Sequence, residues 1–208
     1  MTTVYLVRHS EPFKVHLGIE DVSESLLFEN IKSPLSVRGE KLAEKISLNK
    51  EFSDIDVVWS SNYVRTMSTA KYFANVNNIK VNISEKLSER VHGITSWKQL
   101  PSDFEEHQFS DENYKFGNGE SQKEVRERMF NFLASILNKY KGKRILIVGH
   151  STAIAFLLGK WCEINYNGSY KFKKRVFFDG KWDYCETFKL SFDRNNKLLD
   201  IENIEVID

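Results

Sequence analysis

Short apolar runs alternate with stretches of helical periodicity along most of the chain, and this alternation limits the possible folds more than any other feature of the sequence. The runs predict strands at residues 4–7, 55–59, 80–83 and 145–148. The periodic stretches predict helices at residues 36–48, 60–74, 120–140 and 152–161, the second of them capped by Ser60-Ser61. Every side chain of the run at 145–148 is apolar, which is typical of a strand covered on both faces. Alternating strands and helices favour a mainly parallel sheet between helical layers.

The last part of the chain has a different pattern. Residues 175–178, 187–192 and 199–207 predict strands joined by tight turns, because Asp179-Gly180 and Asn195-Asn196 accept positive φ angles. The predicted fold is therefore α/β and three-layered, with helices on both faces of a mainly parallel sheet and an antiparallel hairpin at the C-terminal end. We expect a single domain over residues 1–208, with a short cap or insertion at about 94–118, where no clean period is visible.

The composition excludes several classes of protein. Hydrophobic residues make up 41% of the 208 residues, which is enough for a sizeable core, so a disordered chain is not expected. Lys and Arg number 30 against 29 Asp and Glu, a balance that argues against nucleic acid as a partner. The two cysteines, Cys162 and Cys185, lack metal-type spacing and favour a reducing cytoplasm. A strand pattern begins by Thr3, which leaves no room for a signal peptide, and no apolar run has the ~18–20 residues of a membrane span.

Ionisable side chains follow each predicted parallel strand. They are Arg8 and His9 after the first strand, Arg65 one helical turn beyond the second, Glu89 and Arg90 after the third, and His150 after the run at 145–148. Taken singly, each is most simply interpreted as a loop, capping or solvated residue. Because the carboxyl ends of parallel strands meet at one edge of a sheet, the joint pattern predicts a functional site there.

Two other chemistries can be weighed against this pattern. Gly149-His-Ser151-Thr-Ala153 resembles the nucleophile elbow of serine hydrolases, but in that fold the catalytic histidine follows the serine. None of the five histidines follows Ser151, so the general base is missing; they are His9, His16, His92, His107 and His150. A metal site is disfavoured because Arg8 and Arg65 would repel a cation, and no P-loop motif is present.

Phosphoryl transfer to a histidine uses all of these residue types. An arginine can hold two oxygens of a phosphate at once, and each charge-assisted hydrogen bond contributes roughly 1.5–3 kcal/mol. The attacking imidazole must be neutral at one nitrogen, and neighbouring cations favour that state by lowering its pKa. The departing alkoxide needs a proton, which a well-placed carboxylic acid can supply.

Several short motifs occur in order between residues 3 and 153. They are Leu6-Val-Arg8-His9-Ser10-Glu11, Pro34-Leu-Ser36-x-x-Gly39, Ser60-Ser61-x-x-x-Arg65-Thr66-x-x-Thr69-Ala70, Leu87-x-Glu89-Arg90-x-x-Gly93, Gly119-Glu120-Ser121 and Val148-Gly-His150-Ser151. Together they resemble the histidine phosphatase superfamily, also called phosphoglycerate-mutase-like proteins. Each motif is weak alone, and their shared order is what makes the resemblance specific.

The resemblance implies a role for each matching residue. His9 would be the phosphorylated nucleophile, Glu89 the proton donor, and Arg8, Arg65 and His150 the groups that hold the phosphoryl group. Further contacts with phosphate or substrate are expected from Ser10, Ser151 and Arg90. No metal or organic cofactor is implied. The expected partner is a small phosphorylated substrate, with no nucleic acid or membrane, and the protein would be a cytoplasmic monomer or homodimer.

The favoured activity is that of a cofactor-independent, histidine acid phosphatase-type phosphoric monoester hydrolase. The alternatives are a phosphoglycerate-type mutase, which Arg90 beside Glu89 favours, and a weakly active or non-catalytic phosphate-binding protein. Ser10 stands where the superfamily usually has glycine, so it either crowds the site or contacts phosphate. Aromatic residues of the cap either line its entrance or pack the cap onto the domain; they are Trp97, Phe104, Phe109 and Tyr114.

Overall fold

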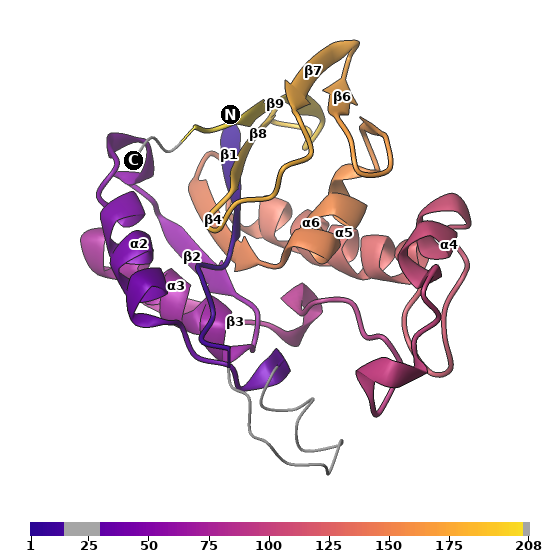
Figure 1. Cartoon of the computed structure of the whole chain (residues 1–208). Helices are drawn as coiled ribbons and strands as arrows, with labels where there is room; N and C mark the ends of the chain where they lie inside the picture. Colours follow the sequence, from indigo (N-terminus) through magenta and orange to yellow (C-terminus); the bar gives the residue numbers. More distant parts are fainter. Residues whose placement is uncertain (15–29, 206–208) are drawn as a thin grey trace.

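A six-stranded sheet lies at the centre of the computed structural model, which describes residues 1–14 and 30–205 (Figure 1). Its strands are β1 (Thr2–Arg8), β2 (Val57–Ser60), β3 (Val81–Ile83), β4 (Arg144–Gly149), β8 (Thr187–Phe192) and β9 (Leu198–Asn203). They lie in the order β3-β2-β4-β1-β8-β9. Strands β3, β2, β4 and β1 run parallel, whereas β8 is antiparallel to both of its neighbours, β1 and β9. The predicted fold class is confirmed.

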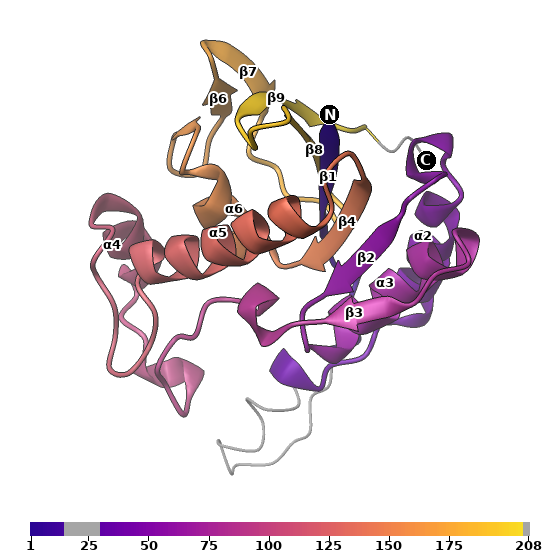
Figure 2. The ribbon, with the colours of Figure 1, turned by 180° about the vertical axis from the view of Figure 1, so that it is seen from behind.

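Helices cover both faces of this sheet. The α-helices of the described residues are α2 (Val37–Ser47), α3 (Val64–Val76), α4 (Phe104–Ser110), α5 (Gln122–Lys139) and α6 (Ser151–Leu158), and the single turns of 3-10 helix are η2 (Lys50–Phe52), η3 (Glu85–Leu87) and η4 (Trp97–Gln99). Helices α2 and α3 lie on one side of the sheet, and α5 and α6 lie on the other (Figures 1 and 2). Helix α2 begins where its sequence predicts, because the Ser36 hydroxyl accepts a hydrogen bond from the Gly39 amide.

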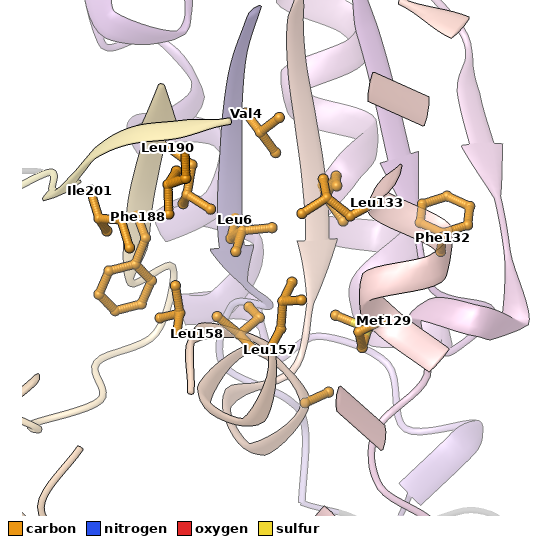
Figure 3. Close-up of a cluster of buried hydrophobic side chains, with 14 of the residues drawn as sticks. Val4, Leu6, Met129, Phe132, Leu133, Leu157, Leu158, Phe188, Leu190 and Ile201 are labelled. Atoms are coloured by element: carbon orange, nitrogen blue, oxygen red, sulfur yellow. The ribbon is translucent and has the colours of Figure 1, made fainter. Parts of the chain in front are cut away.

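Alternate side chains of the central strands enter two separate cores. Val4 and Leu6 of β1 pack with α5, α6 and the inner face of β8 and β9 (Figure 3). Tyr5 and Val7 alternate with these two residues and pack against α2 and α3 on the opposite face. All four side chains are fully buried, and burying one such side chain contributes about 1.5–3 kcal/mol. Because side chains alternate between the two faces along a strand, this register also fixes the directions of the side chains at the end of β1.

The C-terminal part differs from the prediction. Asn195-Asn196 does turn β8 back into β9, with Asn196 at a φ of 61°. Asp179-Gly180 does not join two neighbouring strands, because β7 (Arg175–Phe178) pairs with β6 (Tyr170–Phe172) instead. With β5 (Glu163–Ile164), these form a separate three-stranded sheet. A strand pattern indicates that a segment pairs, but it does not identify the partner.

The region expected to form a cap contains η4 and α4. Its side chains and backbone are bound to the start of α5, for example through the Lys123 amide, which donates to the Glu112 carbonyl over 2.9 Å. No helix among residues 1–14 and 30–205 is long and apolar enough to cross a membrane.

Candidate active site

Strand β1 ends in Arg8, and His9 follows it at the carboxyl edge of the sheet. The His9 ring is buried, and its Nδ1 lies 2.7 Å from the Ser10 carbonyl oxygen. A carbonyl oxygen can only accept, so Nδ1 carries the proton of the neutral ring and Nε2 keeps its lone pair. Burial, followed by the charges of Arg65 and Arg8, holds the pKa of His9 well below its usual range. The His9 ring is therefore neutral and nucleophilic at Nε2.

His150 lies beside His9 because β4 pairs with β1, with Gly149 opposite Arg8. The centroids of the two imidazole rings are 5.4 Å apart. His150 Nδ1 lies 3.2 Å from Nη2 of Arg65, which can only donate, so Nδ1 accepts and Nε2 carries the proton. Burial, and then the charge of Arg65, lowers the pKa of His150 well below its usual range.

The proton on His150 Nε2 faces a serine that the sequence interpretation treated as a helix cap. Ser61 Oγ lies 2.9 Å from His150 Nε2 and 2.6 Å from Thr66 Oγ1, and Thr66 in turn donates to the Tyr63 carbonyl over 2.8 Å. The hydroxyls therefore form a chain that starts at His150 and ends on the backbone. Helix α3 begins only at Val64 and has no side-chain cap, so the predicted capping role of Ser60 and Ser61 is wrong.

Two arginines give the site its positive charge. Arg8 donates through Nη1 to the Trp182 carbonyl over 2.7 Å, and its Nε is buried with no hydrogen-bond partner among the described residues. Arg65 is held by the carbonyl and side chain of Asn30 and lies over the Tyr63 ring. Burial lowers the pKa of both arginines, as expected for cations removed from water. An anion in the site would relieve this cost.

Glu89 is held against the helix that starts directly after His150. Its Oε1 accepts from the Ala153 amide over 2.9 Å, and its Oε2 lies 3.4 Å from the Thr152 amide. Its charge also acts on both Arg8 and Arg65. The structure thus brings together, at one sheet edge, the five residues to which the sequence assigned the chemistry. We call them the strand-edge cluster: Arg8, His9, Arg65, Glu89 and His150.

This geometry agrees with the family to which the chain is related. The model of the histidine phosphatase superfamily (branch 1) matches residues 4–200. The chain belongs to this superfamily. Two curated proteins named probable phosphoglycerate mutase GpmB, from Salmonella arizonae and Escherichia fergusonii, are each 29% identical to it over 166 and 170 residues. Each match covers 76% of this chain and 74% of the relative.

Solved structures show the same fold at lower identity. A mutant of phosphoserine phosphatase from Entamoeba histolytica, in complex with phosphoserine, is 17% identical with a TM-score of 0.66, covering 97% of both chains. Mycobacterial glucosyl-3-phosphoglycerate phosphatase with inorganic phosphate is 15% identical with a TM-score of 0.68, covering 98% of both chains. Bacillus stearothermophilus YhfR is 19% identical with a TM-score of 0.68, covering 96% of this chain and 95% of that one.

Ser10, which replaces the usual glycine of the superfamily motif, does not offer its hydroxyl to the site. Its side chain is fully buried and donates to the Gly39 carbonyl over 2.7 Å, while its amide donates to Thr69 Oγ1 over 2.9 Å. Residue 39 must itself be a glycine, since a Cβ there would lie 2.1 Å from the Glu11 carbonyl oxygen. The expected contact of the Ser10 hydroxyl with phosphate is therefore not supported, and Ser10 joins β1 to α2.

Arg90, the neighbour of Glu89, belongs to a different group. Its Nη1 and Nη2 form a two-pronged ion pair with Glu105 at 2.9 and 2.7 Å, and Nη1 also donates to Gln108. Nη2 lies 2.9 Å from His92 Nε2. We call Arg90, His92, Glu105 and Gln108 the cap cluster. The Arg90 side chain is only 4% exposed and its guanidinium is already occupied by a carboxylate, so the expected phosphate contact of Arg90 is not supported either.

The remaining expected residues divide between packing and a cavity. Trp97 and Phe104 pack against His92, and Tyr114 packs against Phe104, so these rings and His92 form one aromatic cluster. Phe109 instead lines a cavity together with Ser151, the first residue of α6. Within residues 1–14 and 30–205, no three His, Cys, Asp or Glu side chains are grouped as a metal site requires.

Proposed function

We propose that this protein is a phosphomonoesterase that works through a phosphohistidine formed on His9. The observation that carries the proposal is the state of the His9 ring. The Ser10 carbonyl fixes the proton on Nδ1, and burial beside two arginines holds the pKa of the ring below its usual range. A histidine in a cationic site is thus kept neutral, with its free lone pair at the position of an incoming phosphate.

The reaction then takes two steps. His9 Nε2 attacks phosphorus, the ester P–O bond breaks, and the departing alcohol oxygen takes a proton from the Glu89 carboxyl group. Water next attacks the phosphohistidine and gives its proton to the Glu89 carboxylate, which releases inorganic phosphate and restores His9. The hydrogen bonds from the Thr152 and Ala153 amides keep the Glu89 carboxyl group in one place through both steps.

Arg8 and Arg65 stabilise the charge that develops on the transferred oxygens. Their guanidinium groups are positioned before the substrate arrives, so little reorganisation is needed during the reaction. Removing one such preorganised donor typically lowers kcat by about 10²–10³-fold. The unpartnered Nε of Arg8 would find its acceptor in a phosphate oxygen.

A mutase is the second candidate, since the curated relatives carry that name. A phosphoglycerate mutase must hold a carboxylated substrate for a second transfer, which requires further cationic groups. Arg90 was the residue that most favoured this activity, and its guanidinium is neutralised by Glu105. Hydrolysis is therefore the better supported activity. A small phosphorylated metabolite in the cytoplasm, acted on by a monomer or homodimer, is the setting that accompanies the proposal.

The test is release of inorganic phosphate from an aryl phosphate by purified protein. His9→Ala should abolish release, whereas His107→Ala, a matched change on the exposed surface of α4, should leave it unchanged. Activity of His9→Ala near that of the wild type would refute the proposal. Transfer of phosphate between positions of phosphoglycerate, dependent on a bisphosphorylated primer, would establish the mutase instead. Phosphate binding without turnover would indicate a binding protein.

A further inference from the structure

We propose that the cavity beside the strand-edge cluster receives the alcohol part of the substrate, and that it selects flat or ring-shaped groups that are uncharged or positively charged over carboxylated ones. This inference rests on the proposed phosphatase activity and adds the substrate class. It departs from the phosphoglycerate that the names of the curated relatives suggest.

The cavity has a volume of about 220 Å³, and some of its lining residues are direct neighbours of the strand-edge cluster. Ser151 and Thr152, which line it, follow His150 directly, and the Thr152 amide faces the carboxyl group of Glu89. Trp182, also in the lining, accepts a hydrogen bond from Arg8 through its carbonyl. The leaving oxygen takes its proton from Glu89, so the group attached to that oxygen extends toward this cavity.

The walls of the cavity are aromatic and amide-rich. The rings of Phe109 from α4 and Tyr166 from the loop before β6 pack directly on each other, with their centroids 5.1 Å apart, and form one part of the wall. Phe156, Tyr170 and Trp182 contribute further rings, and two asparagines, Asn165 and Asn167, contribute amides. Such a lining favours a planar group that stacks on aromatic faces and makes a few hydrogen bonds.

The charge of the cavity decides between substrates. Glu105 is the only carboxylate among its lining residues within the described chain, and no lysine or arginine lines it. The Arg90 guanidinium is paired with Glu105, and Arg126, which lines a neighbouring cavity, is paired with Glu112. A carboxylated alcohol would therefore enter without a free cation to pair with, which is unfavourable for a partly desolvated anion.

A positively charged group meets the opposite conditions. Glu105 is paired with Arg90, but its side chain is 58% exposed, so its carboxylate oxygens can still accept from a cation. The aromatic faces attract cations through their quadrupoles. A neutral group incurs no electrostatic cost from the Glu105 carboxylate or from the aromatic faces. The order of preference is therefore cationic or neutral first, and anionic last.

The experiment compares three esters that differ only at the para position: 4-(aminomethyl)phenyl, 4-(hydroxymethyl)phenyl and 4-carboxyphenyl phosphate. For the wild-type protein, kcat/KM should be lowest for the carboxylate, by about tenfold or more relative to the neutral ester. Equal values, or a preference for the carboxylate, would overturn the inference while leaving the proposed phosphatase intact. Absence of hydrolysis of all three esters would instead remove the phosphatase on which the inference rests.

Two variants sharpen the comparison. Glu105→Gln removes the carboxylate and frees Arg90, so it should raise the relative kcat/KM of the carboxylated ester about tenfold, whereas Glu106→Gln, the same change on the exposed face of α4, should not. Tyr166→Lys introduces a cation at an exposed position of the lining, 42% accessible in the wild type, and tests the same point if Glu105→Gln fails to fold. An unchanged ester preference in a folded Glu105→Gln variant and in Tyr166→Lys would contradict the proposal.

Discussion

The strand-edge cluster and the cap cluster contain the same kinds of side chain and differ in how their charge is balanced. Each has an arginine within hydrogen-bond distance of a histidine nitrogen: Arg65 at His150 and Arg90 at His92. In each, burial and the neighbouring arginine lower the histidine pKa, for His92 to about 4. Only Arg90 forms a two-pronged pair with a carboxylate.

This difference separates a reactive site from a structural one. In the cap cluster Glu105 neutralises Arg90, and the group holds α4 to the rest of the protein. Among the described residues, the cations of the strand-edge cluster lack such a partner at ion-pair distance, and Arg8 Nε has no acceptor. Uncompensated positive charge favours the binding of an anion. In a compensated buried pair, removing one partner destabilises the protein, because the other charge is left unpaired. Glu89 and Arg90, adjacent in the sequence, belong to opposite clusters.

Matched substitutions of the two arginines test this contrast with the largest expected effect. Arg65→Met should lower kcat by about 10²–10³-fold, because it removes a preorganised donor to the transferred phosphoryl group. Arg90→Met should leave the chemical step largely intact. It should instead lower the free energy of unfolding by about 1–3 kcal/mol, since Gln108 and Glu105 lose their buried partner. Steady-state kinetics and urea unfolding measure both quantities, and equal losses of kcat in the two variants would break the distinction.

The histidines of both clusters should make stability depend on pH. His9, His92 and His150 have folded pKa values below the ordinary 6.5, so the unfolded chain binds more protons than the native one as pH falls. Stability is therefore complete above pH 6.5 and decreases below it, by about 1.4 kcal/mol per pH unit for each histidine. The decrease for His92 should end near pH 4. The free energy of unfolding would be measured with urea at a series of pH values. In His92→Asn its slope against pH should be smaller by the share of one histidine, and an unchanged slope would contradict the lowered pKa of His92.

The chain of hydroxyls behind His150 has no counterpart in the cap cluster among the described residues. We expect a substitution in this chain to have a moderate effect on kcat. Ser61→Ala removes the acceptor of the His150 Nε2 proton, so kcat should fall about tenfold as the ring loses its fixed tautomer. Ser60→Ala, whose hydroxyl only donates to the Ser61 carbonyl, is the matched control. Nitrogen NMR of the ring distinguishes a positioning role from a structural one. If the His150 tautomer is the same in Ser61→Ala as in the wild type, Ser61 does not position the ring.

Ser10 should give the smallest effect, because its hydroxyl serves packing rather than chemistry. Ser10→Gly loses the hydrogen bond to the Gly39 carbonyl, which should cost about 0.5–1.5 kcal/mol of stability and leave kcat near the wild-type value. Thermal unfolding and a phosphatase assay measure the two quantities. A large gain in activity would show that the serine crowds the site after all.

The strand-edge cluster could be predicted from sequence because a general rule applies to it. Parallel strands deliver the residues at their carboxyl ends to one edge, so Arg8, His9 and His150 had to meet once the strands were identified. The role of Arg90 could not be predicted in this way. Its partner Glu105 lies in the cap, where the sequence shows no clean period, and only the folded chain brings the two together.

The fold was predictable to a similar degree. Buried strands and long amphipathic helices carry strong periodic signals, and these elements appear within a few residues of their predicted bounds. The sheet of β5, β6 and β7 was missed because two of its strands are only two and three residues long. The contact of Ser61 with His150 was missed because a serine before a helix is most often a cap.

The most direct test of the central claim is to trap the phosphorylated enzyme. The wild-type protein and His9→Ala would each be mixed with radiolabelled p-nitrophenyl phosphate, quenched in alkali, in which phosphohistidine survives, and analysed by peptide mass spectrometry. We expect the label on the peptide that contains His9, acid-labile and absent from His9→Ala. Label on another residue, or rapid hydrolysis with no trapped label in the wild type, would contradict the account.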